Sequence, residues 1–203
     1  SPEIVQDLTL REALGLALFD ALSLDRRVVL AGEDIGKIGG VLRTTALSKR
    51  LVHAITPESV DGIILDFLPL QKKFPDRVLD TPLDENGVVG VMGIGLSLAG
   101  LRPAVEIQFS GFSPIAFDQI IELARQPQRY GGIIESFPCV IRLPFGGGKR
   151  IENHETTEIP YFANIPGLVV ACPSTAQDAY DLLFAAFYSG KGVLFFEHLD
   201  LYR

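Results

Sequence analysis

Glu85 is the residue with the clearest chemical potential, because it stands where a short apolar run gives way to a Gly-rich stretch. No charged residue occurs between Asn86 and Leu101, so this carboxylate lies at the mouth of an apolar element. Burial there favours the protonated form of a carboxyl group unless the group is paired or used in chemistry. Glu85 is therefore a candidate proton carrier. The alternative is that Asp84 and Glu85 only complement the positive end of the following helix.

His154 is a second candidate, because its imidazole lies on a polar segment that follows a predicted strand. Glu152, Glu155 and Glu158 flank it, and nearby carboxylates raise the pKa of an imidazole and keep a proton available near neutrality. A solvated loop histidine is the alternative. Ligands of open α/β sheets bind at the end where such a segment lies, beyond the carboxyl ends of the strands.

Phe112 and the run Gly146-Gly147-Gly148 could both contact a ligand. Phe112 follows a predicted strand, where its ring could stack on a flat ligand, although core packing explains such a residue as well. The three glycines permit close backbone approach to an anion, or they form a surface loop. The sequence contains no dinucleotide-binding, P-loop or HExxH motif, and no residues are assigned to a metal.

Composition excludes several classes of protein. The 203 residues are 47% hydrophobic and carry a formal net charge of -7, which favours one globular domain and argues against nucleic acid as a partner. The uncharged run after Glu85 is shorter than a membrane span needs, so no membrane association is expected. Cys139 and Cys172 occur singly inside apolar runs, and we expect both to be core thiols in a reducing compartment.

Apolar runs and helical periodicities alternate along the chain, which predicts a three-layer αβα domain with a mainly parallel sheet over residues 1–203. Thr9 and Glu12 form a predicted capping box for the first helix. Strands are expected at 28–32, 77–80, 104–109, 139–143, 168–172 and 193–196, and further helices at 86–99, 114–124 and 176–188. Residues 46–69 fit less well, and we expect a helix followed by an irregular surface excursion that is dispensable for folding.

Several segments together resemble one family, and they follow its order along nearly the whole chain. They are Gly32-Glu-Asp-Ile-Gly, Gly39-Gly-Val-Leu-Arg-Thr-Thr, Asp76-Arg-Val-Leu-Asp-Thr-Pro-Leu-Asp-Glu-Asn-Gly, Arg102-Pro-Ala-Val-Glu-Ile-Gln-Phe, Ala116-Phe-Asp-Gln-Ile, Arg142-Leu-Pro-Phe-Gly-Gly-Gly, Pro166-Gly-Leu-Val-Val and Phe195-Phe-Glu-His-Leu-Asp-Leu-Tyr-Arg. The chain resembles the β subunit of thiamine-diphosphate-dependent 2-oxo acid dehydrogenases, the E1 component. The resemblance implies the pyrimidine-binding domain of the thiamine-diphosphate fold, which a C-terminal transketolase-type domain normally follows.

The resemblance also gives roles to individual residues. Glu85 matches the glutamate that hydrogen-bonds N1′ of the aminopyrimidine and promotes the imino tautomer, from which the C2 proton of the cofactor is removed. Phe112 matches the ring stacked on the aminopyrimidine, and His154 matches a loop histidine that donates a proton during decarboxylation or acyl transfer. Glu33 and Asp118 match carboxylates of a polar tunnel between two active sites, or else a turn acid and an exposed helix acid.

By this resemblance the chain is an enzyme component that acts only with an E1 α subunit in an α2β2 heterotetramer. The α subunit would supply the motif that holds magnesium and the diphosphate, and the acyl product would pass to a lipoyl domain of the E2 core. The cytoplasm, or the mitochondrial matrix in a eukaryote, is the expected location. The alternatives are the pyrimidine domain of another thiamine enzyme, such as an acetoin dehydrogenase or a transketolase relative, and a non-catalytic fragment.

Three departures from the family pattern bear on these expectations. About twenty residues between Ala46 and Pro69 are additional, and the helix after Glu85 carries one extra residue near Gly93-Ile-Gly95. The turn Ser189-Gly-Lys-Gly192 replaces the turn that often forms a potassium site in the family. The substrate 2-oxo acid is not defined by these residues.

Overall fold

The fold is a six-stranded parallel sheet covered by helices on both faces. The structure is a computed structural model, which describes residues 7–55, 66–129, 136–147, 154 and 156–203. The strand order is β4-β1-β5-β6-β8-β7, and every neighbouring pair is parallel. The strands are β1 (Val28–Gly32), β4 (Val78–Asp80), β5 (Arg102–Glu106), β6 (Cys139–Phe145), β7 (Leu168–Ala171) and β8 (Gly192–His198). The predicted three-layer fold and all six predicted strands are confirmed.

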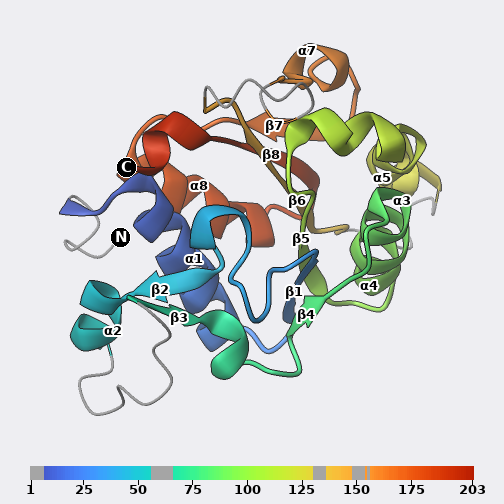
Figure 1. The fold of residues 1–203 in the computed structure, drawn as a ribbon. Coiled ribbons are helices and arrows are strands. Elements are labelled where there is room, and N and C mark those ends of the chain that lie inside the picture. Colours follow the sequence, from blue (N-terminus) through green and yellow to red (C-terminus); the bar gives the residue numbers. More distant parts are fainter. Residues whose placement is uncertain (1–6, 56–65, 130–135, 148–153, 155) are drawn as a thin grey trace.

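Two helical layers enclose this sheet, and each has its own apolar core. In Figure 1, α1 (Leu10–Leu24) and α8 (Ala176–Tyr188) lie together on one side of the strands, and α3 (Glu85–Gly87), α4 (Leu96–Leu98) and α5 (Phe117–Arg129) lie on the other. The short elements η5 (Ser110–Ala116) and α7 (Ile159–Phe162) precede α5 and β7, and η6 (Leu199–Tyr202) follows β8 as the last element. Strands buried on both faces explain why each predicted strand is a nearly continuous apolar run.

Side-chain caps fix the starts of the two long helices on one face. The backbone N–H of Glu12 donates to Thr9 Oγ1 at 3.3 Å, and Glu12 Oε2 accepts from the Thr9 N–H at 3.1 Å, so the predicted capping box is present. Thr175 Oγ1 accepts from the N–H of Asp178 at 3.1 Å at the start of α8. These bonds satisfy donors that a helix start leaves unpaired. No helix of the described residues combines the length and apolar character needed to cross a membrane.

The helix after Glu85 is continuous but changes its winding. α3 passes into the π-helix η4 (Val88–Gly95), which passes into α4. A π-helix is wider than an α-helix and accommodates an additional residue. Glycine gives the necessary space, because a Cβ atom at Gly93 would lie 3.1 Å from Cys139 Sγ on β6. The extra residue expected near Gly93 is thus accommodated within the helix.

The segment 46–69 does not form a surface excursion over the part that the structure describes. β2 (Ala46–Ser48) pairs antiparallel with β3 (Phe67–Pro69), and α2 (Lys49–Ile55) follows β2 directly; η3 (Leu70–Lys72) follows β3. Leu47, Leu51 and Leu68 are at most 4% exposed and belong to the core beneath α1. The expected helix is present as α2, but the buried side chains show that the described part is not a surface excursion. Joining residue 45 to residue 70 would remove these side chains, and the dispensability of the segment stays a prediction. The rest, residues 56–65, lies outside the described residues.

The two cysteines differ, although both were expected in the core. Cys139 is buried in β6, and burial raises the pKa of its thiol to about 12. Cys172 is exposed, because it follows β7, the strand at the edge of the sheet. Both are free thiols.

Candidate functional site

A small, open pocket lies beyond the carboxyl ends of three neighbouring strands. Glu33 enters it after β1, residues 82–85 enter it after β4, and residues 106–108 enter it at the end of β5. Parallel strands end at one edge of the sheet, so segments that are distant in sequence meet there. This is the edge at which open α/β sheets bind ligands.

The structure assigns different roles to Asp84 and Glu85. Asp84 is the N-cap of α3, and its Oδ1 accepts from the N–H of Gly87 at 3.0 Å. Glu85 is the first helical residue and lines the pocket, and no hydrogen bond or ion pair to another described residue engages its carboxylate. The alternative in which both acids only complement the helix start therefore applies to Asp84, while Glu85 is left available.

Glu33 and Glu85 are brought together in this pocket, although 52 positions separate them in the chain. Burial raises the pKa of Glu33, and the negative charges of Asp34 and Glu85 raise it further. Within the described residues, no lysine or arginine lines the pocket. Two carboxylates without a cation hold a shared proton more readily than either alone.

Phe112 and His154 meet in an aromatic cluster next to this pocket rather than inside it. The His154 ring lies 4.1 Å from the ring of Phe109 and 5.5 Å from that of Phe112, measured between centroids. Phe112 belongs to η5, which contacts α3 and thereby the element that carries Glu85. His154 Nδ1 is buried and has no hydrogen-bond partner among the described residues. The cluster offers flat rings and a free ring nitrogen on an element adjacent to Glu85.

The acidic surroundings expected for His154 are not seen in the described residues. The side chain of Glu158 accepts a hydrogen bond from Ser110 Oγ at 2.6 Å, and both residues are buried. Glu152 and Glu155 lie outside the described part of the chain. The described neighbours of His154 are aromatic, and the expected effect of Glu152 and Glu155 lies outside the described residues.

Asp118 and the glycine run lie apart from the pocket. Asp118 is exposed in the first turn of α5, where its carboxylate accepts from Gln119 Nε2 at 3.1 Å. Gly146 and Gly147 have φ values of +74° and +101°. A Cβ atom at Gly146 would lie 3.0 Å from His198 Nε2, so the close approach that this glycine permits is to a side chain of the protein itself. Gly148 is not described.

A buried charge network below the pocket was not foreseen from the sequence. Arg142 on β6 donates to Glu106 on β5 at 2.7 Å, and to both carboxylate oxygens of Glu197 on β8 at 2.6 and 2.9 Å. Tyr202 donates a further hydrogen bond to Glu197. Burial raises the pKa of Glu106, and the positive charge of Arg142 opposes this shift. Each of the four side chains is at most 4% exposed.

A signal for this network is present in the sequence. Glu106, Arg142 and Glu197 each follow directly on two apolar residues of a strand. Charged residues are almost never buried unless they are paired, so three of them in adjacent buried strands predict a paired cluster. The strand order, which brings β5, β6 and β8 side by side, is needed to recognise that they pair with one another.

The arrangement of strands, pocket acids and Gly-rich helix can be compared with known proteins. Residues 6–203 match the family described as "Transketolase, pyrimidine binding domain". The chain belongs to this family. A solved structure named "Split gene transketolase, inactive beta4 tetramer" superposes with a TM-score of 0.64 at 20% identity, covering 93% of this chain and 50% of that one, which supports the fold.

This pyrimidine-binding domain is also similar in sequence to curated proteins. It is 41% identical to the pyruvate dehydrogenase E1 component subunit beta of Leifsonia xyli subsp. xyli, over 98% of this chain and 52% of that protein. It is 37% identical to the 3-methyl-2-oxobutanoate dehydrogenase subunit beta of Mycobacterium tuberculosis, over 96% and 50%. It is equally identical to the 2-oxoisovalerate dehydrogenase subunit beta of Bacillus subtilis, over 95% and 52%. The chain spans about half the length of these relatives.

Proposed function

We propose that this domain supplies the pyrimidine half of a thiamine diphosphate site in the E1 component of a 2-oxo acid dehydrogenase. The observation that carries the proposal is the pocket in which Glu33 and Glu85 lie together without a cation among the described residues. The similarity to β subunits of pyruvate and branched-chain 2-oxo acid dehydrogenases supports the substrate class.

The described residues fit the aminopyrimidine end of this cofactor. When bound, thiamine diphosphate supplies the carbanion that attacks a 2-oxo acid and the electron sink for loss of carbon dioxide. Glu85 would hold a proton at its carboxylate toward the ring nitrogen, and Glu33 would keep that proton exchangeable by its like charge. Phe112 would provide an aromatic face, and the unpartnered Nδ1 of His154 would hold a proton for a later step.

A partner subunit would have to bind the diphosphate end of the cofactor. The sequence has no GDG-then-Asn motif, and no three His, Cys, Asp or Glu side chains of the described ranges gather as a metal site. An E1 α subunit in an α2β2 assembly would supply magnesium and diphosphate ligands, and the acyl group would pass to a lipoyl domain of E2. Calorimetric titration with thiamine diphosphate and magnesium tests this division. Tight binding is expected only after an α subunit is added, and tight binding by this chain alone would contradict it.

The substitution Glu85→Gln tests the role of the carboxylate. The amide keeps the size of the side chain and loses the shareable proton, so turnover of the enzyme reconstituted with an α subunit is expected to fall by roughly 10²–10⁴-fold. Exchange of the cofactor C2 proton with deuterium should slow correspondingly. His154→Ala should leave this exchange nearly unchanged while it reduces turnover, because the histidine is assigned to a later step.

Asp84→Asn is the matched control for Glu85→Gln. Asparagine caps a helix about as well as aspartate, so this variant removes a neighbouring negative charge and keeps the start of α3. Its C2 exchange should stay close to that of the unmodified enzyme. If both variants slow C2 exchange equally, local charge rather than the Glu85 proton is responsible. If neither slows it, the proposed site is wrong.

A further inference from the structure

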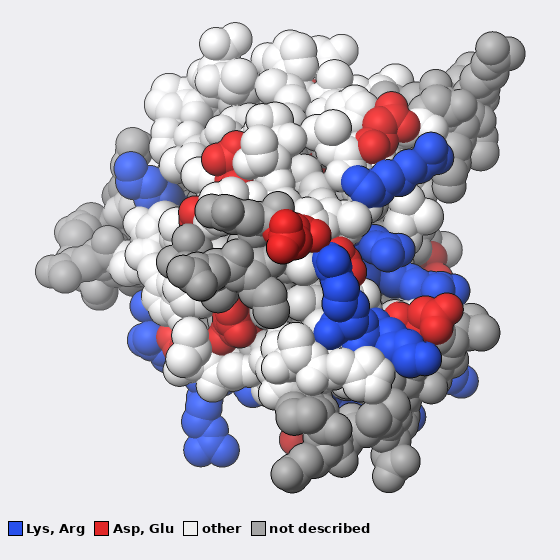
Figure 2. Space-filling view, turned by 90° about the vertical axis from the view of Figure 1, so that its left-hand side faces the viewer, with Lys and Arg blue, Asp and Glu red and all other residues white. Residues whose placement is uncertain are grey.

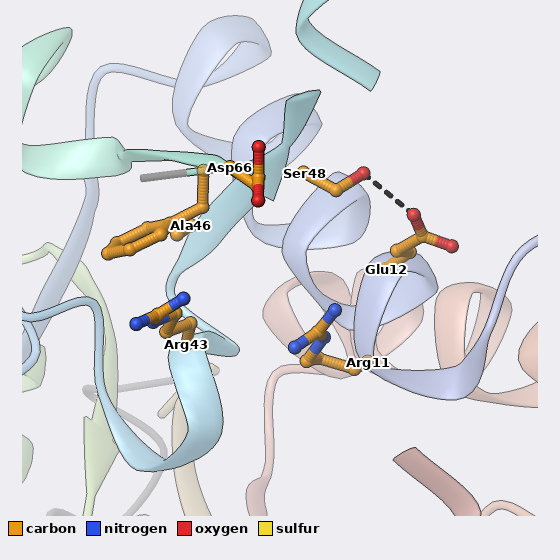
Figure 3. Close-up of a pocket in the computed structure, with 7 residues that line it drawn as sticks. Arg11, Glu12, Arg43, Ala46, Ser48 and Asp66 are labelled. Atoms are coloured by element: carbon orange, nitrogen blue, oxygen red, sulfur yellow. Dashed lines mark hydrogen bonds between the residues drawn. The ribbon is translucent and has the colours of Figure 1, made fainter. Parts of the chain in front are cut away.

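A second pocket, with a cavity volume of about 70 Å³, lies apart from the Glu33–Glu85 pocket and has no role in the proposed function. It is bounded by the start of α1, by η2 (Val41–Arg43) and by the β2–β3 hairpin. Figure 3 shows the guanidinium groups of Arg11 and Arg43 reaching into it from α1 and η2. Two positive groups from separate elements thus converge on one cavity of a chain whose net charge is -7.

Neither guanidinium is neutralised within the described residues. No ion pair joins Arg11 or Arg43 to a described carboxylate. Glu12 lines the same pocket, but its carboxylate accepts from Ser48 Oγ and from Arg50 at 2.7 Å each. Asp66, at the opposite side of the pocket in Figure 3, is exposed. The pocket therefore has donor capacity that the described residues do not use.

The carboxylate of Glu12 is also held ionised, and its oxygens already accept hydrogen bonds. Burial acts to raise its pKa, but hydrogen bonds from Ser48 and Thr9 and the positive charge of Arg50 outweigh burial and hold the pKa below its usual value. Because these partners occupy the carboxylate, Glu12 does not compete for Arg11. Figure 2 shows Lys and Arg side chains gathered to the right of the middle of the face turned toward the viewer, with Asp and Glu interspersed.

The backbone holds Arg43 in place at a conformational cost. Leu42 and Arg43 have φ values of +48° and +66°, the left-handed region that is unfavourable for residues other than glycine. The loop is anchored from beneath, because the N–H of Val41 donates to buried Glu106 at 3.0 Å and Arg142 donates to Thr45 Oγ1 at 3.1 Å. Strain of this kind persists where the surroundings over-determine it, and it is concentrated at ligand sites.

Phe67 orients the Arg43 side chain further. The Arg43 Cζ lies 4.1 Å from the centre of the Phe67 ring, and Phe67 is buried in β3. A guanidinium that stacks through its face keeps the N–H groups of its edges free for an anion. Arg43 is thus preorganised as a donor, and the loss of side-chain entropy on binding is reduced.

We propose that the Arg11–Arg43 pocket binds a phosphate group. Each guanidinium can donate two parallel hydrogen bonds, a fork that fits a pair of oxygen atoms. A tetrahedral dianion such as phosphate has several such pairs of oxygen atoms, whereas a carboxylate has one. Two forks from α1 and η2 therefore match a phosphate better than a carboxylate. The phosphate can come from free inorganic phosphate or from a phosphomonoester of a small molecule, and the exposed opening of the pocket does not restrict the choice.

Calorimetric titration of the 203-residue chain with inorganic phosphate tests the proposal without measuring enzyme activity. The buffer contains chloride, and its ionic strength is held constant. Saturable binding is expected. Arg11→Gln and Arg43→Gln should each weaken it at least tenfold, and Arg43→Lys should weaken it less, because lysine keeps the charge but loses the fork. Asp66→Asn should tighten binding severalfold by removing a like charge. Arg26→Gln, at an exposed arginine that lines neither pocket, should have no effect.

Two outcomes would overturn the proposal. One is unsaturable binding by the unmodified chain. The other is equal affinity in the Arg11, Arg43 and Arg26 variants, provided that circular dichroism shows each variant folded. Acetate should bind at least tenfold more weakly than phosphate, and equal affinity would contradict the assignment to a phosphate. Glycerol phosphate identifies the source: binding like that of phosphate indicates an ester, and no binding indicates the free ion.

Discussion

Asp25 and Glu33 flank the same five-residue strand, β1, yet their pKa values move in opposite directions. Asp25, before the strand, accepts hydrogen bonds from Arg27 and lies 3.2 Å from Arg102 Nε, and these partners hold its pKa at about 2. Glu33, after the strand, is partly buried, and this burial and the negative charges of Asp34 and Glu85 raise its pKa. The acid before β1 is paired with arginines, whereas the acid after β1 has no cationic partner among the described residues.

The difference distinguishes acids whose charge stabilises the fold from acids that could take part in chemistry. In the pocket beyond the carboxyl end of β1, Glu106 is compensated by Arg142, and Arg142 also pairs with Glu197 on β8. Within the described residues, Glu33 and Glu85 line the pocket at the carboxyl ends of β1 and β4 without an ion pair to a cation. Other described acids, such as buried Glu158, also lack a cation and accept hydrogen bonds instead. The absence of a cation therefore marks the candidate site only together with the pocket that the two acids share.

The largest expected effect comes from removing the compensating cation. Arg142→Met leaves two buried carboxylates without a partner, and breaking a buried ion pair in this way costs about 3–5 kcal/mol. Urea unfolding measures the loss. The matched control is Arg125→Met, which breaks an exposed pair with Glu122 at 3.4 Å and should change stability by no more than about 0.5 kcal/mol. Similar losses of stability in both variants would mean that the buried network contributes no more to stability than an exposed ion pair.

Asp25→Asn should have a smaller effect that depends on pH. The folded pKa of about 2 lies below the value of 3.8 for a free aspartate, so the stabilisation is complete above the unfolded pKa and is lost as the pH falls through 2. We expect a cost of about 1–2 kcal/mol at pH 7 that nearly vanishes at pH 2. Urea unfolding at both values measures it, with the exposed Asp76→Asn as the control. A cost independent of pH would show that charge is not its cause.

The smallest effect concerns the uncompensated pair. Because the charge of Glu85 is one cause of the raised pKa of Glu33, Glu85→Gln should lower the Glu33 pKa in a carboxyl NMR titration. A raised folded pKa also means that Glu33 destabilises the fold as the pH rises through that value. Asp118→Asn, at an exposed acid outside the pocket, should leave the Glu33 pKa unchanged. An equal shift in both variants would disprove a direct interaction.

The main elements were predictable because their signals are local. The six sheet strands are short apolar runs, and the caps at Thr9 and Thr175 sit within one turn of the helices they begin. The β2–β3 pair was missed because each strand has three residues and the partners are 19 or more positions apart. Such pairing depends on burial of Leu47 and Leu68 beneath α1, which no local pattern shows.

The candidate site was predictable in part. Glu85 stood out as a charge beside an uncharged helix, and its meeting with Glu33 followed from strand order in a parallel sheet. The burial of Glu106, Arg142 and Glu197 needed the neighbour relations of three strands. The aromatic neighbours of His154 come from η5, more than 40 positions away, so the nearby glutamates in the sequence predicted different surroundings.

The π-helical stretch η4 has a consequence for how the protein tolerates changes of length. It lies between Glu85, at the pocket, and β5, at the centre of the sheet. Because a π turn absorbs one residue locally, a one-residue insertion or deletion in η4 can interconvert π and α winding without moving either end. The spacing between pocket and sheet is thereby insulated from small differences in chain length.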